Sequence, residues 1–328
     1  MANDHVLVTG AGGFIGSNLV DDQLSRGRTV TALDVNLERL QHQKSNRKCL
    51  LVVGDVRNAE LLEKVTKSQN VIFHLASAHL EVNQTESYFR EINVDAVAAL
   101  AKVAEKNNVD RLVHCSSVGV YGPLDRLPAD EKTPCHPDII YERTKLMGEE
   151  ALRAAADELS WVIVRPSWVY GPRCHRTLKL LRTIKSKKFF MVGKQKTYRH
   201  PVYISDLLEG FELAANNDAA IGETFILSGN EPVLLEQLVQ QIAATQNSGF
   251  RPLTVPLTLM VPLCFLVEKT FAIIGKEPPF SRRSLKFFTE SSAFNISKAR
   301  EVIGYSPQVS LAEGLGLTNR YFEEQNLL

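Results

Sequence analysis

The chain has 328 residues, with 38 Lys and Arg against 37 Asp and Glu and 44% hydrophobic residues. This composition is typical of a folded globular protein and excludes a largely disordered one. A formal net charge of +1 excludes the strongly basic character of a nucleic-acid-binding domain. The length fits about two folding units, or one large α/β domain with an attached lobe.

The cysteines indicate a reducing environment. Their number is odd and none lies close to another, so we expect neither a disulfide framework nor a metal site; they are Cys49, Cys115, Cys135, Cys174 and Cys264. No apolar signal core precedes the first strand-like run, Val6-Leu7-Val8. We therefore expect a cytoplasmic protein.

The most apolar stretch covers residues 252–267. It is 16 residues long, contains three prolines and is followed by Glu268 and Lys269. It is too short and too interrupted for a membrane span. Its apolar character favours buried packing, with a substrate lid or a membrane-facing patch as the alternatives.

Short β-branched runs alternate with stretches of helical periodicity in the first half of the chain, which indicates βαβ units and a parallel sheet. Strands are predicted at residues 5–8, 29–33, 50–53, 71–75, 111–115 and 160–165. Helices are predicted at residues 14–25, 59–67, 88–107, 141–158, 234–244 and 296–303.

The predicted fold is therefore α/β, a Rossmann-type doubly wound parallel sheet with a smaller mixed C-terminal substrate-binding lobe. The dinucleotide-binding core is expected over residues 1–172, with a return segment near 200–228. Residues 173–199 and 229–328 are expected to form the lobe.

A glycine-rich turn directly follows the first predicted strand, as Thr9-Gly10-Ala11-Gly12-Gly13-Phe14-Ile15-Gly16. Gly10 permits a tight turn, Gly13 lets the backbone approach a pyrophosphate, and Gly16 lets the helix pack closely on the sheet. Strand, glycines and helix follow in the order that a dinucleotide-binding site requires.

Acidic and small residues end the next strands. Asp34, 24 residues after Gly10, ends the second strand, where a carboxylate binds the adenosine ribose and repels a 2′-phosphate. NAD is thus favoured over NADP, although Arg39 lies nearby. Asp55-Val56 and Leu75-Ala76-Ser77 follow the third and fourth strands, at the edge where open α/β sheets bind ligands.

A candidate proton-transfer group lies on the fourth predicted helix. Tyr141 and Lys145 are four residues apart, on one helical face. A neighbouring cation stabilises a phenolate, so we expect a lowered Tyr141 pKa and proton exchange with a secondary alcohol or ketone. Ser117 follows the fifth strand and could hold the substrate oxygen.

These motifs resemble those of the extended short-chain dehydrogenases/reductases, which include NAD-dependent sugar epimerases, dehydratases and 3β-hydroxysteroid dehydrogenases. Further matches are Asn93-Val94, Val169-Tyr170-Gly171-Pro172 and residues 199–206. The resemblance implies catalytic residues Ser117, Tyr141 and Lys145 and a homodimer through residues 88–107 and 141–158. It implies a cofactor site of Gly10, Gly13, Phe14, Ile15, Gly16, Asp34, Asp55, Val56, Leu75, Ala76, Ser77, Asn93, Tyr141 and Lys145.

The positions after Ser117 separate the reactions of this superfamily. Family 4,6-dehydratases carry an Asp-Glu pair there and the related decarboxylases keep the glutamate, whereas this chain has Val118 and Gly119. The cysteine that 4-keto sugar epimerase-reductases place two residues after the serine is also missing. Simple hydride transfer remains, as in a 4-epimerase or a dehydrogenase.

Charge distribution favours an anionic substrate. Residues 159–205 contain no Asp or Glu and eleven Lys or Arg, and by resemblance they form much of the substrate cleft. A cationic cleft attracts a diphosphate. Arg199 matches the family arginine that contacts the nucleotide diphosphate, and Arg173 is a second candidate.

Trp168 favours a different substrate. Sugar-nucleotide epimerases usually have an asparagine at that place, and an indole offers one donor and no acceptor. Steroid-type dehydrogenases resemble the chain better here. We therefore expect an epimerase of nucleotide-diphosphate sugars or a related sugar oxidoreductase, with a dehydrogenase of a sterol-like alcohol and a non-catalytic dinucleotide-binding regulator as alternatives.

Overall fold

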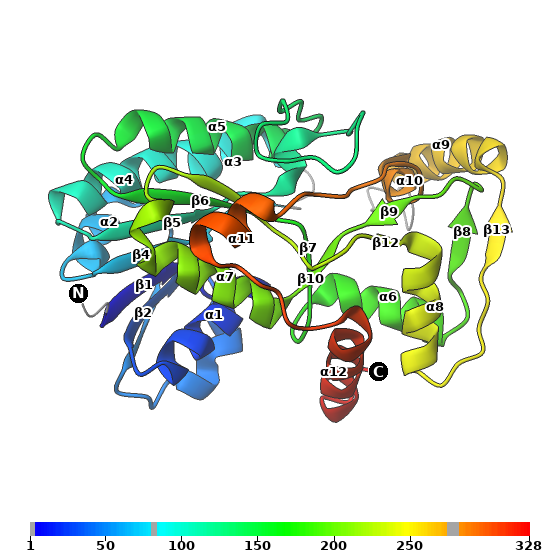
Figure 1. Cartoon of the computed structure of the whole chain (residues 1–328), viewed down its shortest axis with the longest axis horizontal. Coiled ribbons are helices and arrows are strands. Elements are labelled where there is room, and N and C mark those ends of the chain that lie inside the picture. Colours follow the sequence, from blue (N-terminus) through cyan, green and yellow to red (C-terminus); the bar gives the residue numbers. More distant parts are fainter. Residues whose placement is uncertain (1–3, 80–83, 274–281) are drawn as a thin grey trace.

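The computed structural model describes residues 4–79, 84–273 and 282–328. A parallel seven-stranded sheet forms its centre, in the order β11-β6-β5-β4-β1-β2-β3 (Figure 1). The strands are β1 (His5–Thr9), β2 (Thr29–Asp34), β3 (Cys49–Val53), β4 (Val71–His74), β5 (Arg111–Cys115), β6 (Trp161–Pro166) and β11 (Thr224–Leu227).

Helices cover both faces of this sheet, and a buried apolar cluster lies on each face. One face carries α2 (Ala59–Thr66), α3 (Glu86–Arg90), α4 (Ala96–Lys106) and α5 (Ile140–Ala155). The other carries α1 (Phe14–Ser25), α7 (Ile204–Asn216) and α11 (Ser297–Ile303). The doubly wound α/β prediction is confirmed.

Small sheets and further helices form the rest of the molecule. The strand pairs are β10 (Pro201–Tyr203) with β7 (Trp168–Tyr170), β12 (Val233–Leu234) with β9 (Tyr198–Arg199), and β13 (Leu253–Val255) with β8 (Phe190–Val192). The helices are α6 (His175–Lys185), α8 (Leu235–Thr245), α9 (Leu257–Ile273), α10 (Arg282–Thr289) and α12 (Leu311–Glu324). The proposed boundary at residue 172 stays a prediction.

The helix predicted at residues 88–107 is not one regular helix. It begins earlier, at Glu86, because the Thr85 side chain accepts a hydrogen bond from the Tyr88 amide and caps the first turn. A π-helical turn, Glu91–Asp95, then separates α3 from α4. This wide turn contains Asn93, which is fully buried, and such turns often occur at functional sites.

The expectation that residues 252–267 pack into the interior is wrong for most of the stretch. Within α9, Met260 and Cys264 are buried, but Leu259 and Leu266 are 62% and 63% exposed. α9 packs against α10 along one side, which leaves its remaining apolar residues at the surface. Among the described residues, no helix has the length and apolarity needed to cross a membrane.

A buried ion pair connects α5 to β6. Arg165 donates from Nη2 and Nε to the two carboxylate oxygens of Glu149, at 2.6 and 2.9 Å, and Ser116 donates to the same carboxylate at 2.5 Å. Glu149 is fully buried, and these partners hold the pKa of its carboxyl below the usual value against the effect of burial. The pair fixes α5 against the sheet beside Ser116 and Ser117.

Substituting Arg165→Met should lower the free energy of unfolding by about 3–5 kcal/mol, because it leaves the buried Glu149 charge without its main partner. Arg153 bonds the same carboxylate at 3.1 Å from a half-exposed position, so Arg153→Met is the matched control and should cost about 1 kcal/mol or less. Urea unfolding monitored by circular dichroism measures both. Equal losses in the two variants would contradict this account.

Candidate functional site

The site lies at the carboxyl edge of the sheet, where β1 and β4 are neighbours. From this point β2 and β3 extend the sheet on one side, and β5, β6 and β11 extend it on the other. This is the position where doubly wound sheets bind ligands. The Gly10 turn leaves β1 here with a φ of +69°, and a Cβ at Gly10 would lie 2.5 Å from the Ala76 amide nitrogen. The sequence reasoning missed Gly12, where a Cβ would lie 1.7 Å from the Asn36 carbonyl oxygen.

The turn leads into α1, whose first turn has no side-chain cap. Amide groups at such a helix start bind phosphate oxygens, with support from the helix dipole. Two cavities, of about 360 and 190 Å³, lie beside the turn and share Gly10, Gly13, Leu75 and Ser77. An extended ligand with a phosphate near the glycines and a group in each cavity fits this shape, as a dinucleotide would.

The smaller cavity contains the acidic residues expected at an adenosine site, since Asp34, Asp55 and Val56 line it. Asp34 accepts hydrogen bonds from the amides of Gly12 and Asn36, at 2.9 and 3.0 Å. Asp55 is paired with Arg57 at 2.7 Å, which holds the pKa of its carboxyl below the usual value. Arg39 does not line this cavity, but it donates to the Gly12 carbonyl oxygen at 2.8 Å.

Asn93 lines neither of these cavities. Its amide nitrogen donates to Ala78 O and Thr144 Oγ1, and its oxygen accepts from Ala78 N and Ser77 Oγ. These four bonds use its full hydrogen-bonding capacity. Asn93 therefore positions Ser77 and Ala78 through its side chain, and its expected contact with the cofactor stays a prediction.

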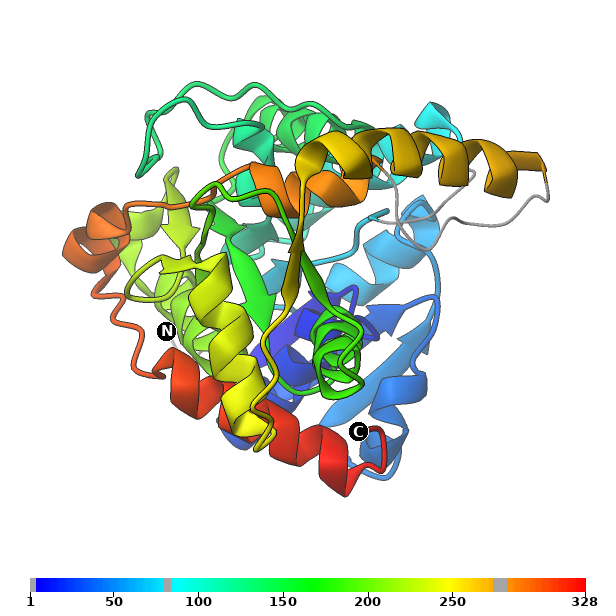
Figure 2. The ribbon, with the colours of Figure 1, turned by 90° about the vertical axis from the view of Figure 1, so that its right-hand side faces the viewer.

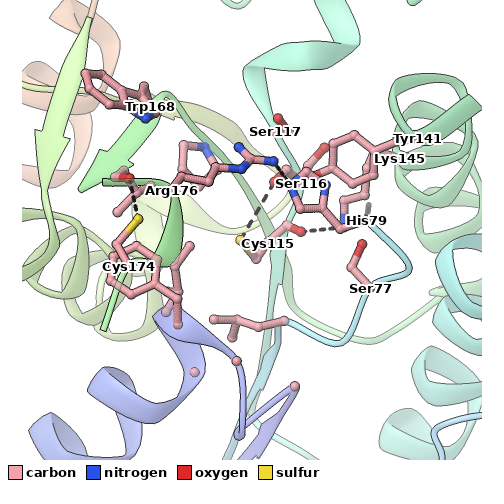
Figure 3. A pocket seen from close by; sticks show the side chains of 18 of the residues that line it. Ser77, His79, Cys115, Ser116, Ser117, Tyr141, Lys145, Trp168, Cys174 and Arg176 are labelled. Atoms are coloured by element: carbon pink, nitrogen blue, oxygen red, sulfur yellow. Dashed lines mark hydrogen bonds between the residues drawn. The ribbon is translucent and has the colours of Figure 1, made fainter. Parts of the chain in front are cut away.

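The larger cavity brings Ser117, Tyr141 and Lys145 together (Figure 3). Ser117 follows β5, and its side chain accepts a hydrogen bond from the Gly119 amide at 3.0 Å. Lys145 is buried and donates to the Cys115 carbonyl oxygen at 2.6 Å. The four-residue spacing thus places both α5 side chains in one cavity, beside the loop that leaves β5.

The expectation of a lowered Tyr141 pKa is wrong for the chain by itself. Burial raises the pKa of Tyr141 above its usual value, and this effect outweighs a hydrogen bond with Ser117 and the charge of Arg176, which lower it. Burial also lowers the pKa of Lys145. Proton removal from Tyr141 therefore needs positive charge beyond what these side chains supply.

Two residues beside Tyr141 were missed by sequence reasoning. The His79 ring lies 4.2 Å from the Tyr141 ring, centroid to centroid, and Arg176 is hydrogen-bonded to His79 Nε2. Figure 3 shows Arg176 reaching across the cavity from the side of the lobe. Neither residue belongs to a motif, so only the fold could bring them to the site.

Residues 159–205, which contain no Asp or Glu, do not form one cationic cleft. Of their eleven basic residues, Arg176 lines the larger cavity, whereas Arg165 is paired with Glu149 and Arg173 with Asp21. The exposed Lys179, Arg182, Lys185, Lys187, Lys188, Lys194 and Lys196 line neither this cavity nor the smaller one.

Arg199 lines a separate cavity of about 200 Å³, next to Val118 and Gly119. It donates to the carbonyl oxygens of Tyr198, Lys286, Phe287 and Glu290, and burial lowers its pKa to about 10. These bonds hold the end of α10. To bind a diphosphate, Arg199 would have to release some of them.

Trp168 lines the larger cavity together with Ser167 and Val169. Its ring centroid lies 6.2 Å from that of the buried Tyr170. The wall of the cavity is therefore partly aromatic. Such a wall can pack against the face of a sugar ring or against an apolar ring system.

Comparison with known families identifies the chain. Residues 6–227 match the model of the "NAD dependent epimerase/dehydratase family". The chain belongs to this family. The resemblance to extended short-chain dehydrogenases/reductases is thereby confirmed, and the protein is an NAD(P)-dependent epimerase or oxidoreductase of that type.

Individual relatives differ in substrate. The chain is 28% identical to an N-acetyl-alpha-D-glucosaminyl-diphospho-ditrans,octacis-undecaprenol 4-epimerase of Escherichia coli O157:H7, over 97% of this chain and 95% of that protein. It is 27% identical to a decarboxylating sterol-4-alpha-carboxylate 3-dehydrogenase of Schizosaccharomyces pombe, over 99% of both. The fold matches UDP-glucuronic acid 4-epimerase from Bacillus cereus, solved with UDP-glucuronic acid and NAD, with a TM-score of 0.78, 23% identity and coverage of 98% and 99%.

Two buried histidines, His74 at the end of β4 and His114 one residue before the end of β5, stack with ring centroids 5.3 Å apart. Burial, together with the Lys145 charge, lowers the pKa of His74 to about 3 and that of His114 well below its usual value. Both rings are therefore neutral in the folded protein at neutral pH.

The free energy of unfolding should fall as pH drops below about 6.5, because the histidines take up protons in the unfolded chain and not in the folded one. Stability is full above the unfolded pKa and is lost progressively toward the folded pKa. His114→Leu removes one of these groups. Between about pH 7.5 and pH 5 the free energy of unfolding of this variant should therefore fall by less than that of the native protein. Urea unfolding at both pH values tests this, and parallel losses would contradict it.

Proposed function

We propose that the protein catalyses NAD-dependent hydride transfer at a secondary alcohol of a diphosphate-linked sugar, as a 4-epimerase of nucleotide sugars. The observation that carries the proposal is the cavity shared by Ser117, Tyr141, Lys145 and the glycine turn. It brings a hydroxyl, a phenol and an ammonium to the place where a dinucleotide's nicotinamide end would lie. A non-catalytic dinucleotide-binding regulator would not require a hydroxyl, a phenol and an ammonium in one cavity.

In the proposed reaction the substrate hydroxyl lies between Ser117 and Tyr141. Tyr141 takes the hydroxyl proton as the carbon loses hydride, which leaves a ketone. NAD held beside the glycine turn would supply the acceptor, and later the donor, of that hydride with its electron pair. Return of hydride to the opposite face, with the proton given back by Tyr141, produces the epimer without net oxidation.

Because Tyr141 is shielded from solvent, neighbouring positive charge is needed to remove its proton. Because burial raises the Tyr141 pKa, the phenol favours its protonated form until positive charge is added. Lys145 and the charged ring of oxidised NAD would both favour the phenolate. Proton transfer is thus expected mainly in the loaded site.

Replacing Tyr141 by Phe should lower turnover by about 10²-fold or more, because it removes the general base and keeps the ring. NAD binding should change little. Tyr170→Phe is the matched control, since Tyr170 is a buried tyrosine that lines neither cavity. Near-normal turnover in Tyr141→Phe would refute the assignment.

Arg176 is the side chain that we propose for recognition of a substrate anion. It is exposed, it lines the larger cavity and it lies beside His79 and Tyr141. A guanidinium binds phosphate through paired hydrogen bonds. The diphosphate sugars in the names of two relatives support this substrate class.

A second candidate, oxidation of a sterol-like alcohol, is favoured by Trp168 in the cavity wall and by the sterol dehydrogenase among the relatives. A thermal-shift panel with NAD distinguishes the two, by comparing UDP-, GDP- and dTDP-sugars with sterols. Stabilisation by a nucleotide sugar that weakens in Arg176→Gln but not in Lys179→Gln supports the first. Stabilisation by sterols alone supports the second.

We further propose a preference for NAD over NADP, based on the Asp34 carboxylate in the smaller cavity. Asp34→Ser should raise the affinity for NADP relative to NAD by about tenfold, because it removes repulsion of the 2′-phosphate while Arg39 stays nearby. Adding Arg39→Ala should cancel much of that gain. Fluorescence titration with both reduced cofactors measures it, and an unchanged ratio in Asp34→Ser would contradict the role of Asp34.

A further inference from the structure

The outward side of α9 is apolar where a surface helix is normally polar. Met260 and Cys264 face inward, in a cluster with Val192 and Leu285. Among residues 258–270 the polar residues are Thr258, Glu268, Lys269 and Thr270, and Glu268 is only partly buried. Its exposed apolar side chains are Leu259, Val261, Leu263, Phe265 and Leu266.

The strand before α9 adds to this surface. β13 leads directly into α9, and its Leu253 is 81% exposed. Figure 2 shows α9 in gold along the rim of the molecule, with α10 in orange on its inner side. We name the exposed residues Leu253, Leu259, Val261, Leu263, Phe265 and Leu266 the α9 surface.

Basic side chains flank the α9 surface. β8, which pairs with β13, continues into Lys194 and Lys196, and these share a cavity with Arg251. At the other end of the helix Lys269 lies over the Phe265 ring at 5.4 Å. Glu236 lines the same cavity and Glu268 precedes Lys269, so these charged residues are four positive and two negative, and the flanking charge is positive on balance.

We propose that the α9 surface docks the protein on an anionic lipid bilayer, with α9 lying in the interface between headgroups and acyl chains. The apolar arc suits the acyl boundary and the flanking lysines suit anionic headgroups. At 17 residues, α9 is about 25 Å long and contains Pro262, which fits a helix lying on a membrane and not one crossing it.

A second copy of the chain suits the α9 surface less well. Symmetric pairing through the same face would bring two basic rims together. The homodimer expected by resemblance pairs through the region of α4 and α5 instead. The charge of the rim therefore favours anionic lipid as the occupant.

Docking would place the membrane beside the substrate side of the site. α9 packs on α10, and Lys286 and Phe287 of α10 line the Arg199 cavity next to Val118 and Gly119. A bilayer there could present an amphiphilic alcohol to Tyr141. The docking itself does not depend on which alcohol is oxidised.

Co-sedimentation of the purified full-length protein with vesicles tests the proposal, using phosphatidylcholine alone and phosphatidylcholine with one-third phosphatidylglycerol. The native protein should bind the anionic vesicles, and Leu259→Ser/Leu266→Ser should weaken that binding by about tenfold or more. Lys194→Gln/Lys196→Gln should weaken it too, and added salt should mimic the lysine change.

The matched control is Leu50→Ser/Ile221→Ser, at positions 60% and 43% exposed and outside the α9 surface. It should bind like the native protein. Phe265→Ser provides a second variant if the double substitution lowers the melting temperature. The proposal is overturned if the native protein stays in the supernatant with anionic vesicles. This includes the case in which light scattering shows a dimer that Leu259→Ser/Leu266→Ser dissociates, because the α9 surface would then bind a second copy and not lipid. Equal binding by native protein and α9 variants also overturns it.

Discussion

The parallel pairing of β1 with β4, and of β4 with β5, is the constraint on which the site depends. This register ends all three strands at one edge, so the Gly10 turn, Leu75 to Ser77 and Ser116-Ser117 meet there. α5 adds Tyr141 and Lys145 to the same edge. The Glu149–Arg165 pair and the bond from Lys145 to the Cys115 carbonyl hold that helix in place.

Burial sets the protonation behaviour of the titratable groups in and beside the site. The same desolvation that keeps His74 and His114 neutral raises the pKa of Tyr141 and lowers that of Lys145. An empty site of this kind would be poorly disposed to remove a proton. Under the proposed function, the charge of the bound cofactor would be needed for proton removal, so the acid-base chemistry would depend on dinucleotide binding.

Much of the core could be predicted from the sequence, because local patterns specify it. The Gly10 to Gly16 turn, Asp34 at the end of β2 and the Tyr141/Lys145 spacing are short-range features with a physical reason for each residue. Asn93 was recognised by its motif, but its part in positioning Ser77 and Ala78 depends on a π-helical turn that no local pattern indicated.

The substrate side was less predictable, because it depends on contacts between distant segments. Arg176 is hydrogen-bonded to His79, 97 residues away in sequence. Arg199 donates hydrogen bonds to backbone carbonyl oxygens within residues 286–290. A count of positive charges could not separate the buried arginines from the exposed lysines. Similarly, hydropathy could not show that α9 keeps its apolar side at the surface.

The most direct test of the central claim follows the transferred hydrogen. The sugar nucleotide that stabilises the protein best is labelled with deuterium at the carbon to be inverted, and the product is analysed by mass spectrometry. Hydride transfer to and from bound NAD predicts an epimer that retains the deuterium, without net accumulation of reduced cofactor. An epimer that has exchanged its deuterium for solvent hydrogen would contradict the account.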